Sequence, residues 1–487
     1  MLTKTDFMNY LECPMYLWLS KNRPELLPED DAEKERILAA GREVDEFAKK
    51  LFPKAIEIKG YNEIGFEQTQ KALAQNPKAL FQPTAVAGEL AARADILVAG
   101  QTPGTFDINE VKMATKVKKE YLYDLGFQKI CFEGAGIQIG RLKLVHINGN
   151  YVRHGEINPS QLFDIEDITE DVNEKLPQIQ DEIQRALKII NLKEEPSVTL
   201  INSCANPKYC DYIEHYSKIS EDIFPLAENI QMPHLLHLLE REILDHKKVP
   251  ATLLGKIGFE PPVEFTNINT EGIKRELAKL QYPLYFFDYE TYNCAIPPFD
   301  GTTPYQQIPF QYSLHIQDAP GAQLRHADFL AQTFENPIPG LLEHLQKDMG
   351  SKGSVIVWFA PFETGRNKEM ALGNPEFAQL LNSINERMFD LMVIFKFKNQ
   401  LYTKSEFKKL ASLKVILPVL CPELSYKDLA IQEGGTASAS WPIMTNPQTP
   451  PSERERLKHD MVEYCKRDTL AMAAILERVR ADLDIVV

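Results

Sequence analysis

Acidic side chains recur in the second half of the chain at spacings that suit a metal centre. Asp288 and Glu290 alternate in YFFDYET, and residues two apart in a strand point to the same face. Tyr464 and Asp468 are four residues apart in EYCKRDTLAM, so a helix would place them on one face. Glu363 follows a strand-like run in VIVWFAPFE. Converging carboxylates and a phenol predict a site that holds Mg²⁺ or Mn²⁺ and hydrolyses phosphodiester bonds.

This ordered set resembles the DEDD exonuclease superfamily, in the variant that carries a tyrosine in its third motif. The resemblance covers about Leu284 to Ile485. It implies metal ligands at the four acids Asp288, Glu290, Glu363 and Asp468. It also implies that Tyr464 orients the attacking water and that the domain is RNase H-like, with 3′–5′ exonuclease activity.

The second motif departs from this pattern, because it has Glu363 where the superfamily usually has aspartate. Asp390 in MFDLM is the alternative ligand, but the strand followed by FE fits the usual N-x-x-F-D context better and favours Glu363. The stretch SLKVILP and the following YKDLAIQEGGTASASW suggest a lid or substrate loop that carries Lys414. A surface loop with a packed Trp441 explains that stretch equally well.

A second set of candidate residues lies in the first half of the chain. Asp95 lies in RADILV, and Glu110 and Lys112 lie in INEVK, so a strand, a turn and a second strand would bring them together. Glu110 and Lys112 share a face of the second strand. We expect Asp95 and Glu110 to bind a metal ion, and Lys112 to position or polarise the water beside the scissile phosphate.

The surrounding sequence resembles RecB-like PD-(D/E)XK nucleases, which implies a restriction-endonuclease-like core. Gln128 matches the fourth motif, which usually reads Q-x-x-x-Y but here ends at Phe132, without the hydroxyl. Upstream, GREVDEFAKKLFP resembles the first helical motif, where many relatives have histidine and this chain offers Asp45 or Glu43. These departures leave open whether the first centre is active or only grips nucleic acid.

The cysteines suggest one further site. Nucleases of the CRISPR-associated exonuclease type hold a 4Fe-4S cluster with one cysteine before the core and three after it. Cys13 precedes the core here, and Cys204 and Cys210 follow it, but equal spacing leads to Tyr216. The adjacent His215 allows a cluster with mixed ligands or a Zn²⁺ ion, whereas a relict site or three ordinary buried thiols would need no metal. The remaining cysteines are predicted to be core residues: Cys131, Cys294, Cys421 and Cys465.

The elements that must position these residues alternate between strand-like and helical runs. We expect helices over 32–52 and 171–192 around strands at 94–98, 105–113 and 142–147. Strands at 284–287 and 355–360 and helices over 376–384 and 453–481 describe a second α/β region. The chain of 487 residues is therefore predicted to contain a RecB-like domain over 1–218, a helical connector over 219–282 and an RNase H-like domain over 283–487.

Composition narrows the class of protein without naming a substrate. The net charge of -15 argues against a broadly basic surface that binds nucleic-acid phosphates non-specifically. Carboxylate-rich metal centres contribute to that charge, so it does not exclude nucleic acid. No run suits a membrane span and the N-terminus has no signal-peptide pattern, so we expect a cytoplasmic protein.

As a whole, the chain resembles a bacterial family known only as a domain of unknown function. The resemblance implies a RecB-like module fused to a DEDD exonuclease that cuts DNA or RNA. A nucleic-acid-binding scaffold with one or both centres inactive is the alternative.

Overall fold

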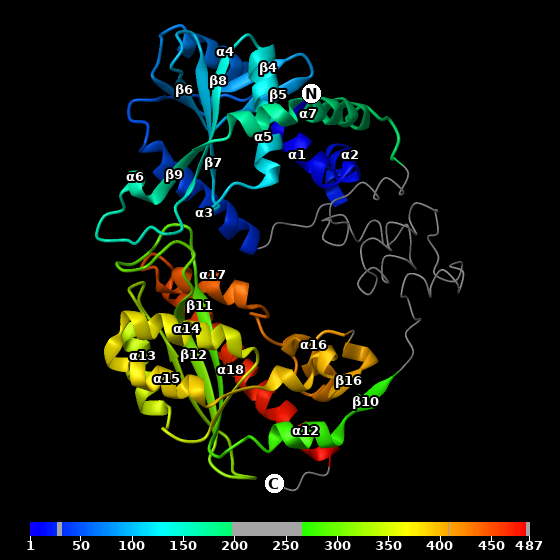
Figure 1. Cartoon of the computed structure of the whole chain (residues 1–487), viewed down its shortest axis with the longest axis vertical. Coiled ribbons are helices and arrows are strands. Elements are labelled where there is room, and N and C mark those ends of the chain that lie inside the picture. Colours follow the sequence, from blue (N-terminus) through cyan, green and yellow to red (C-terminus); the bar gives the residue numbers. More distant parts are fainter. Residues whose placement is uncertain (27–31, 197–264, 408, 484–487) are drawn as a thin grey trace. The chain divides into compact units, whose positions relative to one another are not determined.

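The computed structural model describes residues 1–26, 32–196, 265–407 and 409–483. The chain divides into two compact units (Figure 1). Unit 1 contains Met1–Tyr151 and Gly155–Pro261, and unit 2 contains Val152–His154 and Pro262–Val487. Both units combine helices with mixed sheets, which confirms the α/β class expected from the sequence.

The main sheet of unit 1 has six strands in the order β2-β3-β6-β7-β8-β9. In chain order they are β2 (Ile56–Glu57), β3 (Ala79–Phe81), β6 (Ile96–Ala99), β7 (Phe106–Lys112), β8 (Ile139–Ile147) and β9 (Phe163–Asp167). Strand β7 pairs antiparallel with β6 and parallel with β8. A smaller sheet joins β1 (Leu2–Thr3), β5 (Leu90–Arg93) and β4 (Thr84–Ala87).

The helices of unit 1 cover this sheet and bury its apolar side chains. They are α1 (Lys4–Glu12), α2 (Pro14–Asn22), α3 (Ala32–Lys49), α4 (Asn62–Leu73), α5 (Lys119–Gly134), α6 (Pro159–Leu162) and α7 (Thr169–Ile190), with a 3-10 turn at Pro24–Leu26. Helices α5 and α7 approach closely at Gly126, where a Cβ atom would lie 2.4 Å from Cδ1 of Ile179. The predicted helices over 32–52 and 171–192 are thus confirmed as α3 and α7.

Unit 2 is built on a five-stranded sheet in the order β13-β12-β11-β14-β15. In chain order its strands are β11 (Leu284–Tyr292), β12 (Ile308–Gln317), β13 (Arg325–Leu330), β14 (Ser354–Val357) and β15 (Met388–Asp390). Strand β11 pairs antiparallel with β12 and parallel with β14, and β15 extends the parallel side. The central strand β11 therefore has neighbours along both edges.

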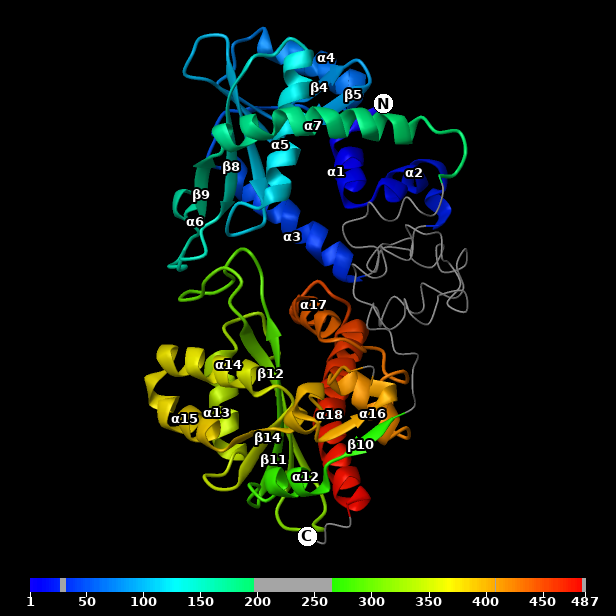
Figure 2. The same ribbon diagram turned by 45° about the vertical axis from the view of Figure 1, so that its right-hand side comes forward.

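Helices pack on both faces of the unit 2 sheet. They are α12 (Thr270–Leu277), α13 (Ile338–Asp348), α14 (Ala360–Gly373), α15 (Ala378–Glu386), α16 (Leu413–Leu420), α17 (Gly434–Thr445) and α18 (Pro451–Asp482). Short 3-10 turns occur at Pro375–Phe377, Leu391–Ile394, Phe397–Asn399 and Ser405–Phe407. Figure 2 shows α13, α14 and α15 on one side of the sheet and α18 on the other.

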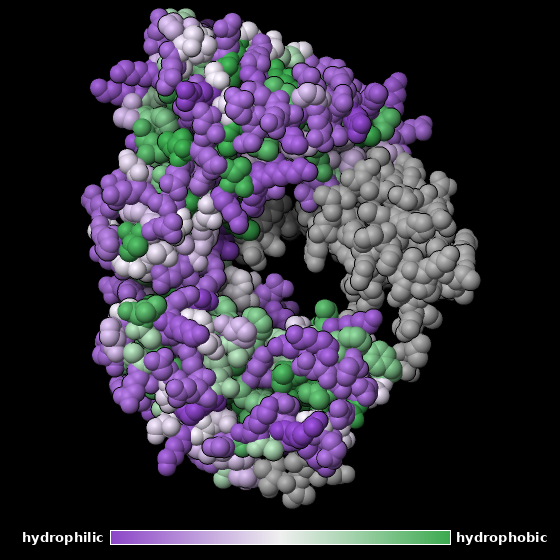
Figure 3. Space-filling view, viewed as in Figure 1, coloured by the Kyte–Doolittle hydropathy of each residue, from purple (hydrophilic) through white to green (hydrophobic). Residues whose placement is uncertain are grey.

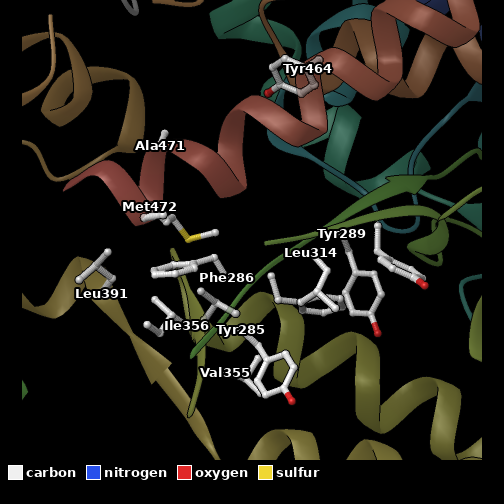
Figure 4. Close-up of a cluster of buried hydrophobic side chains, with 14 of the residues drawn as sticks. Tyr285, Phe286, Tyr289, Leu314, Val355, Ile356, Leu391, Tyr464, Ala471 and Met472 are labelled. Carbon is white, nitrogen blue, oxygen red and sulfur yellow. The ribbon is translucent and has the colours of Figure 1, made fainter. Parts of the chain in front are cut away.

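Alternation along β11 divides its side chains between these two faces. Phe286 is buried against α18, where Met472 lies beside it (Figure 4). Tyr289 points to the opposite face and donates a hydrogen bond from its hydroxyl to Oδ1 of Asn367 on α14, 3.0 Å away. Because side chains alternate along a strand, Asp288 and Glu290 lie on the same face of β11 as Phe286 and point toward α18.

The second unit begins earlier than the sequence boundary near residue 283. Strand β10 (Thr266–Ile268) pairs with β16 (Tyr402–Lys404), and Ile273 of α12 is fully buried in the unit 2 core. The apolar side chains of α12 pack into the unit 2 core, although the sequence had assigned this helix to the connector over 219–282. Residues 266–277 therefore belong to unit 2. Most of the expected connector, 219–264, lies outside the described residues.

Among the described residues, none of the helices combines the length and apolarity that a membrane span requires. Figure 3 shows hydrophilic residues over most of the described surface on the face in view, with hydrophobic residues in small scattered groups.

Candidate metal centres

Strand β11 and helix α18 bring the predicted acidic residues of unit 2 together. Asp288 and Glu290 point from β11 toward α18, and Tyr464 and Asp468 lie one turn apart on that helix. Met472, a further turn along, contacts the apolar core beside Phe286 (Figure 4). The contact between Phe286 and Met472 thus aligns α18 with β11. Asp468 lies one helical turn before Met472, and Asp288 lies two residues after Phe286, so both acids come to the same side of the contact.

The first residue of α17 lies against these carboxylates and the phenol. A Cβ atom at Gly434, the first residue of α17, would lie 3.5 Å from Oε2 of Glu290 and 3.9 Å from the hydroxyl of Tyr464. Tyr464 is buried, and its hydroxyl lies near the acids that the sequence pattern assigned to metal binding. The arrangement suits a phenol that contacts a water molecule at the metal centre.

Glu363 enters from the first turn of α14 and is buried. Its Oε2 atom has no hydrogen-bond partner among the described residues. Asp390, the alternative ligand, accepts a hydrogen bond from the backbone N–H of Met392 at 3.1 Å and pairs with Nζ of Lys396 at 2.9 Å. Of the two acids, Glu363 is therefore the one with an oxygen available for a cation.

The pKa values of these acids are shifted upward, mainly by burial. Burial raises the pKa of Asp288 and of Glu290 well above the ordinary range, and the charge of Asp468 adds to both shifts. Burial also raises the pKa of Glu363 to about 7 and that of Asp468 to about 6. Since each carboxylate disfavours ionisation of its neighbours, a divalent ion would stabilise the ionised form of the whole set.

Two further residues lie at this centre: Tyr426, which the sequence patterns did not single out, and Lys414, which they placed on a possible lid or substrate loop. Tyr426 donates a hydrogen bond to Oδ1 of Asp468. Lys414 Nζ lies 6.0 Å from the centre of the Tyr426 ring and 5.9 Å from that of Tyr464. The sequence had marked the segment with Lys414 as a lid or surface loop, but it folds into α16 and α17, and Trp441 of α17 is fully buried. No local spacing links Tyr426 to Asp468, so only the folded chain identifies it.

Cys465 was expected to be a core residue, and it is fully buried. Its Sγ atom nevertheless lies 3.8 Å from Oδ2 of Asp288, and ligand atoms of Asp288, Glu290 and Cys465 all lie within 4.8 Å of one another. Burial and the neighbouring acids raise the pKa of the Cys465 thiol well above its usual value. The thiol therefore stays protonated, and the oxygen donors remain the better ligands for Mg²⁺ or Mn²⁺.

The predicted residues of unit 1 also lie close together. Asp95 accepts a hydrogen bond from the backbone N–H of Val111 at 2.8 Å, beside Glu110 on β7. Lys112 Nζ lies 2.7 Å from Oε1 of Glu110, and Nε2 of Gln128 on α5 donates to Oε2 of Glu110 at 2.8 Å. The structure therefore brings Asp95, Glu110, Lys112 and Gln128 into one site.

Two further side chains complete this network, and the sequence patterns did not assign them. Lys4 Nζ lies 2.8 Å from Oε1 of Glu110, and Asp124 accepts from Lys112 at 2.7 Å and from Gln128 at 2.8 Å. Asp124 and Gln128 lie four residues apart on α5, a spacing that could have identified Asp124. Lys4 is more than a hundred residues from Glu110 in sequence, so no local pattern connects them.

Electrostatics in unit 1 differ because two ammonium groups face the acids. Burial acts to raise the pKa of Glu110, but Lys112 and Lys4 outweigh it and hold that pKa well below the usual range. Burial and the charge of Glu110 raise the pKa of Asp95 to about 7. Burial, with Glu110 again contributing, raises the pKa of Asp45 to about 6, so Asp45 rather than the exposed Glu43 faces this site.

The cysteine site expected from the sequence can be described only at Cys13, which is buried at the start of α2. Its other expected ligands, Cys204, Cys210 and His215, lie outside the described residues. The iron-sulfur and zinc interpretations therefore stay predictions.

Comparisons with known proteins identify similarity to an uncharacterised group. Residues 285–412 match the family described as Domain of unknown function (DUF2779). The chain is 29% identical over 215 residues to the uncharacterized protein UU173 of Ureaplasma parvum, covering 41% of this chain and 31% of that protein. It is 24% identical over 212 residues to the uncharacterized MG366 homolog of Mycoplasma pneumoniae, covering 40% and 32%. The aligned part thus spans about a third of the length of these relatives, and the matches support a family of unknown function.

One solved structure, titled "Crystal structure of SSO0001", aligns with 43% of this chain and 82% of its own chain at 16% identity. The TM-score of 0.21 is too low to support a structural argument.

Proposed function

We propose that this chain is a metal-dependent nuclease that hydrolyses phosphodiester bonds of DNA or RNA, with a 3′–5′ exonuclease centre in unit 2. One observation carries the proposal: acids from β11, α14 and α18 lie close enough that Asp468 and Glu363 raise the pKa of Asp288 and Glu290, and a buried oxygen of Glu363 has no hydrogen-bond partner among the described residues. Such a set of hard oxygen donors fits Mg²⁺ or Mn²⁺.

The topology of unit 2 supports an RNase H-like domain. Three antiparallel strands, β13, β12 and β11, continue into the parallel strands β14 and β15, and the last helix, α18, crosses the face that carries Asp288 and Glu290. The acids thus come from the central strand, from the helix after β14 and from the last helix. This is the order that the DEDD resemblance implies.

Each residue of unit 2 has a role that follows from its position. Asp288, Glu290, Glu363 and Asp468 would hold the divalent ions. When bound, such ions activate a water molecule and stabilise the leaving oxygen of the phosphodiester. Tyr464 would orient that water, and Lys414 would attract the negatively charged phosphate, because both lie beside the carboxylates.

Unit 1 is proposed to be a RecB-like module with a restriction-endonuclease-like core. Its central strand β7 carries Glu110 and Lys112 on one face, and Asp95 directly precedes the neighbouring antiparallel strand β6, as the motif requires. The Glu110 carboxylate is already bound by Lys4, Lys112 and Gln128. This occupancy favours a second candidate function for unit 1, in which it grips nucleic acid without cutting it.

A 4Fe-4S cluster or a Zn²⁺ ion at Cys13, Cys204, Cys210 and His215 remains part of the proposal for unit 1. The test is metal analysis of the purified chain, together with the ultraviolet-visible spectrum. An iron-sulfur chromophore would support the cluster, and a stoichiometric colourless zinc ion would support the zinc alternative.

The nuclease proposal is tested by incubating end-labelled single-stranded DNA and RNA with the full chain and Mn²⁺. Wild type is compared with Asp288→Ala in unit 2 and Lys112→Ala in unit 1. Products that shorten stepwise from the 3′ end, and that only Asp288→Ala abolishes, would support one exonuclease centre and a binding role for unit 1.

A loss in Lys112→Ala as well would support two active centres. If wild type cuts no substrate with Mg²⁺ or Mn²⁺, the nuclease proposal is wrong, and a nucleic-acid-associated scaffold becomes the better description.

A further inference from the structure

A second phenol, besides Tyr464, contacts the carboxylates of unit 2. Tyr426 lies between α16 and α17, and its hydroxyl donates a hydrogen bond to Oδ1 of Asp468. The ring is 8% exposed, and its centre lies 6.1 Å from that of the Tyr464 ring. Asp468 therefore has one oxygen held by a buried tyrosine and a second oxygen, Oδ2, free of that contact.

The segment around Tyr426 is fastened to the helix that carries Asp468. Arg467, the residue before Asp468, donates a hydrogen bond to the backbone carbonyl of Ser425. Its two terminal nitrogens also lie 3.2 Å from the two carboxylate oxygens of Asp428. One guanidinium thus binds the segment on both sides of Tyr426. This clamp ties the segment that carries Tyr426 to the turn of α18 that carries Asp468.

We propose that Tyr426 is a positioning residue of the unit 2 centre: its hydroxyl holds one oxygen of Asp468 and thereby presents the other oxygen to the divalent ion. The inference rests on the proposed function, because it assigns a role within that same centre. A carboxylate ligand can rotate between one-oxygen and two-oxygen coordination, and a fixed hydrogen bond selects one orientation. The Tyr426 phenol provides this bond without binding the ion itself.

The chain contains two matched controls for this role. Tyr312 donates to Oδ2 of Asp348 at 2.6 Å, and Tyr402 donates to Oδ2 of Asp482 at 2.7 Å. Both tyrosines are fully buried in unit 2, so each phenylalanine variant loses one tyrosine-aspartate hydrogen bond in a comparable environment. Neither Asp348 nor Asp482 belongs to the carboxylate cluster. A general loss of stability would therefore appear in all three variants, whereas a positioning role would appear only in Tyr426→Phe.

The test is a calorimetric titration of the metal-stripped full chain with Mn²⁺. Binding that Asp288→Ala removes defines the unit 2 site. Tyr426→Phe is expected to raise the Kd of that site about tenfold, in the range measured when a side chain that hydrogen-bonds a metal ligand is removed. Tyr312→Phe and Tyr402→Phe are expected to leave that Kd within about twofold, because they lie outside the centre.

Turnover gives a second readout. The kcat defect of Tyr426→Phe should shrink as Mn²⁺ is raised to saturation, with the KM for nucleic acid unchanged, because more metal offsets a poorly oriented ligand.

Asp428→Asn changes an exposed side chain and weakens the contact with Arg467, so it should raise the Kd for Mn²⁺ by a smaller factor. This variant keeps the test decisive if Tyr426→Phe fails to fold.

The outcomes separate the inference from the proposed function. If wild type binds Mn²⁺ and cuts nucleic acid, but Tyr426→Phe and Asp428→Asn bind Mn²⁺ as tightly as wild type, the positioning role is overturned and the nuclease proposal stands. If wild type shows no Mn²⁺ binding that Asp288→Ala removes, both are overturned.

Discussion

The two acidic sites of this chain differ in what balances their charge. In unit 2, the charges of Asp468 and Glu363 add to burial in raising the pKa of Asp288 and Glu290, and Lys414 is a nearby ammonium that acts on Glu290 and Asp468. In unit 1, Lys4 and Lys112 contact Glu110 directly. The protein itself supplies the counter-charge for Glu110.

This difference indicates how strongly each site should require a metal ion. Buried carboxylates that no ammonium group contacts directly ionise less readily and gain more from a bound cation, whereas a carboxylate that already binds two ammonium groups gains less from a metal. Both units therefore show a similar sequence pattern, with two acids near a strand end, but the two sites differ in how strongly they require a metal ion. We expect unit 2 to depend on Mg²⁺ or Mn²⁺ and unit 1 to depend on it much less.

The largest expected effect is on catalysis in unit 2. Asp288→Ala should lower the rate of 3′ end shortening about a thousandfold, because it removes a carboxylate proposed to hold the ions, which would contribute several kcal/mol of transition-state stabilisation. The rate is measured with end-labelled single-stranded substrate and Mn²⁺. Asp328→Ala on strand β13 is the control and should retain wild-type rates. A fully active Asp288→Ala would place the nuclease centre elsewhere.

The second prediction decides whether Glu363 or Asp390 is the metal ligand that accompanies the acids of β11 and α18. Glu363→Ala should reduce the rate about a hundredfold, because the loss of a buried ligand weakens the binding of the ions. Asp390→Ala should reduce it only severalfold, since its oxygens already bind Lys396 and the N–H of Met392. The same assay measures both variants. The reverse ranking would assign the metal to Asp390.

A third change should make the unit 1 site more like that of unit 2. Lys4→Met removes one ammonium from Glu110, so we expect about a tenfold gain in Mn²⁺ affinity, ~1.4 kcal/mol, at unit 1. The titration uses an Asp288→Ala background, which removes binding at unit 2. Lys129→Met, which breaks an exposed pair with Glu133, is the control. An unchanged affinity would show that the ammonium groups do not decide the metal demand of this site.

The smallest effect is on stability. Folding raises the pKa of Glu363 to about 7 and that of Asp468 to about 6, above their ordinary values of 4.5 and 3.8. These groups bind protons more tightly in the folded state, so their contribution is fully present below about pH 4 and is lost as pH rises toward 7. We expect the Tm of the metal-free chain to fall by about 5 °C between pH 5 and pH 8.

Differential scanning calorimetry with and without Mn²⁺ tests this expectation. Mn²⁺ should reduce the fall in Tm, because the ion replaces the protons, and Glu363→Gln should reduce it without metal. An equally steep fall in that variant would show that Glu363 does not contribute to it.

Sequence patterns located much of the candidate site where the geometry is local. Asp288 and Glu290 follow the two-residue period of β11, and Tyr464 and Asp468 follow the turn of α18, so each pair shares a face in the structure as predicted. The burial of Cys465 was also predicted correctly, although its contact with Asp288 was not. The start of unit 2 was placed too late, because β10 pairs with a strand more than a hundred residues away.

The sequence by itself determined the α/β class, the main helices and strands, and the acids that a single strand or helix presents together. These features depend on periodicities of a few residues, which short stretches of sequence record. Only the tertiary structure decided that Tyr426 binds Asp468, that Lys414 lies beside both tyrosines and that Lys4 binds Glu110. Such pairs join residues far apart in the chain, and their distances depend on how whole helices pack, which no local spacing encodes.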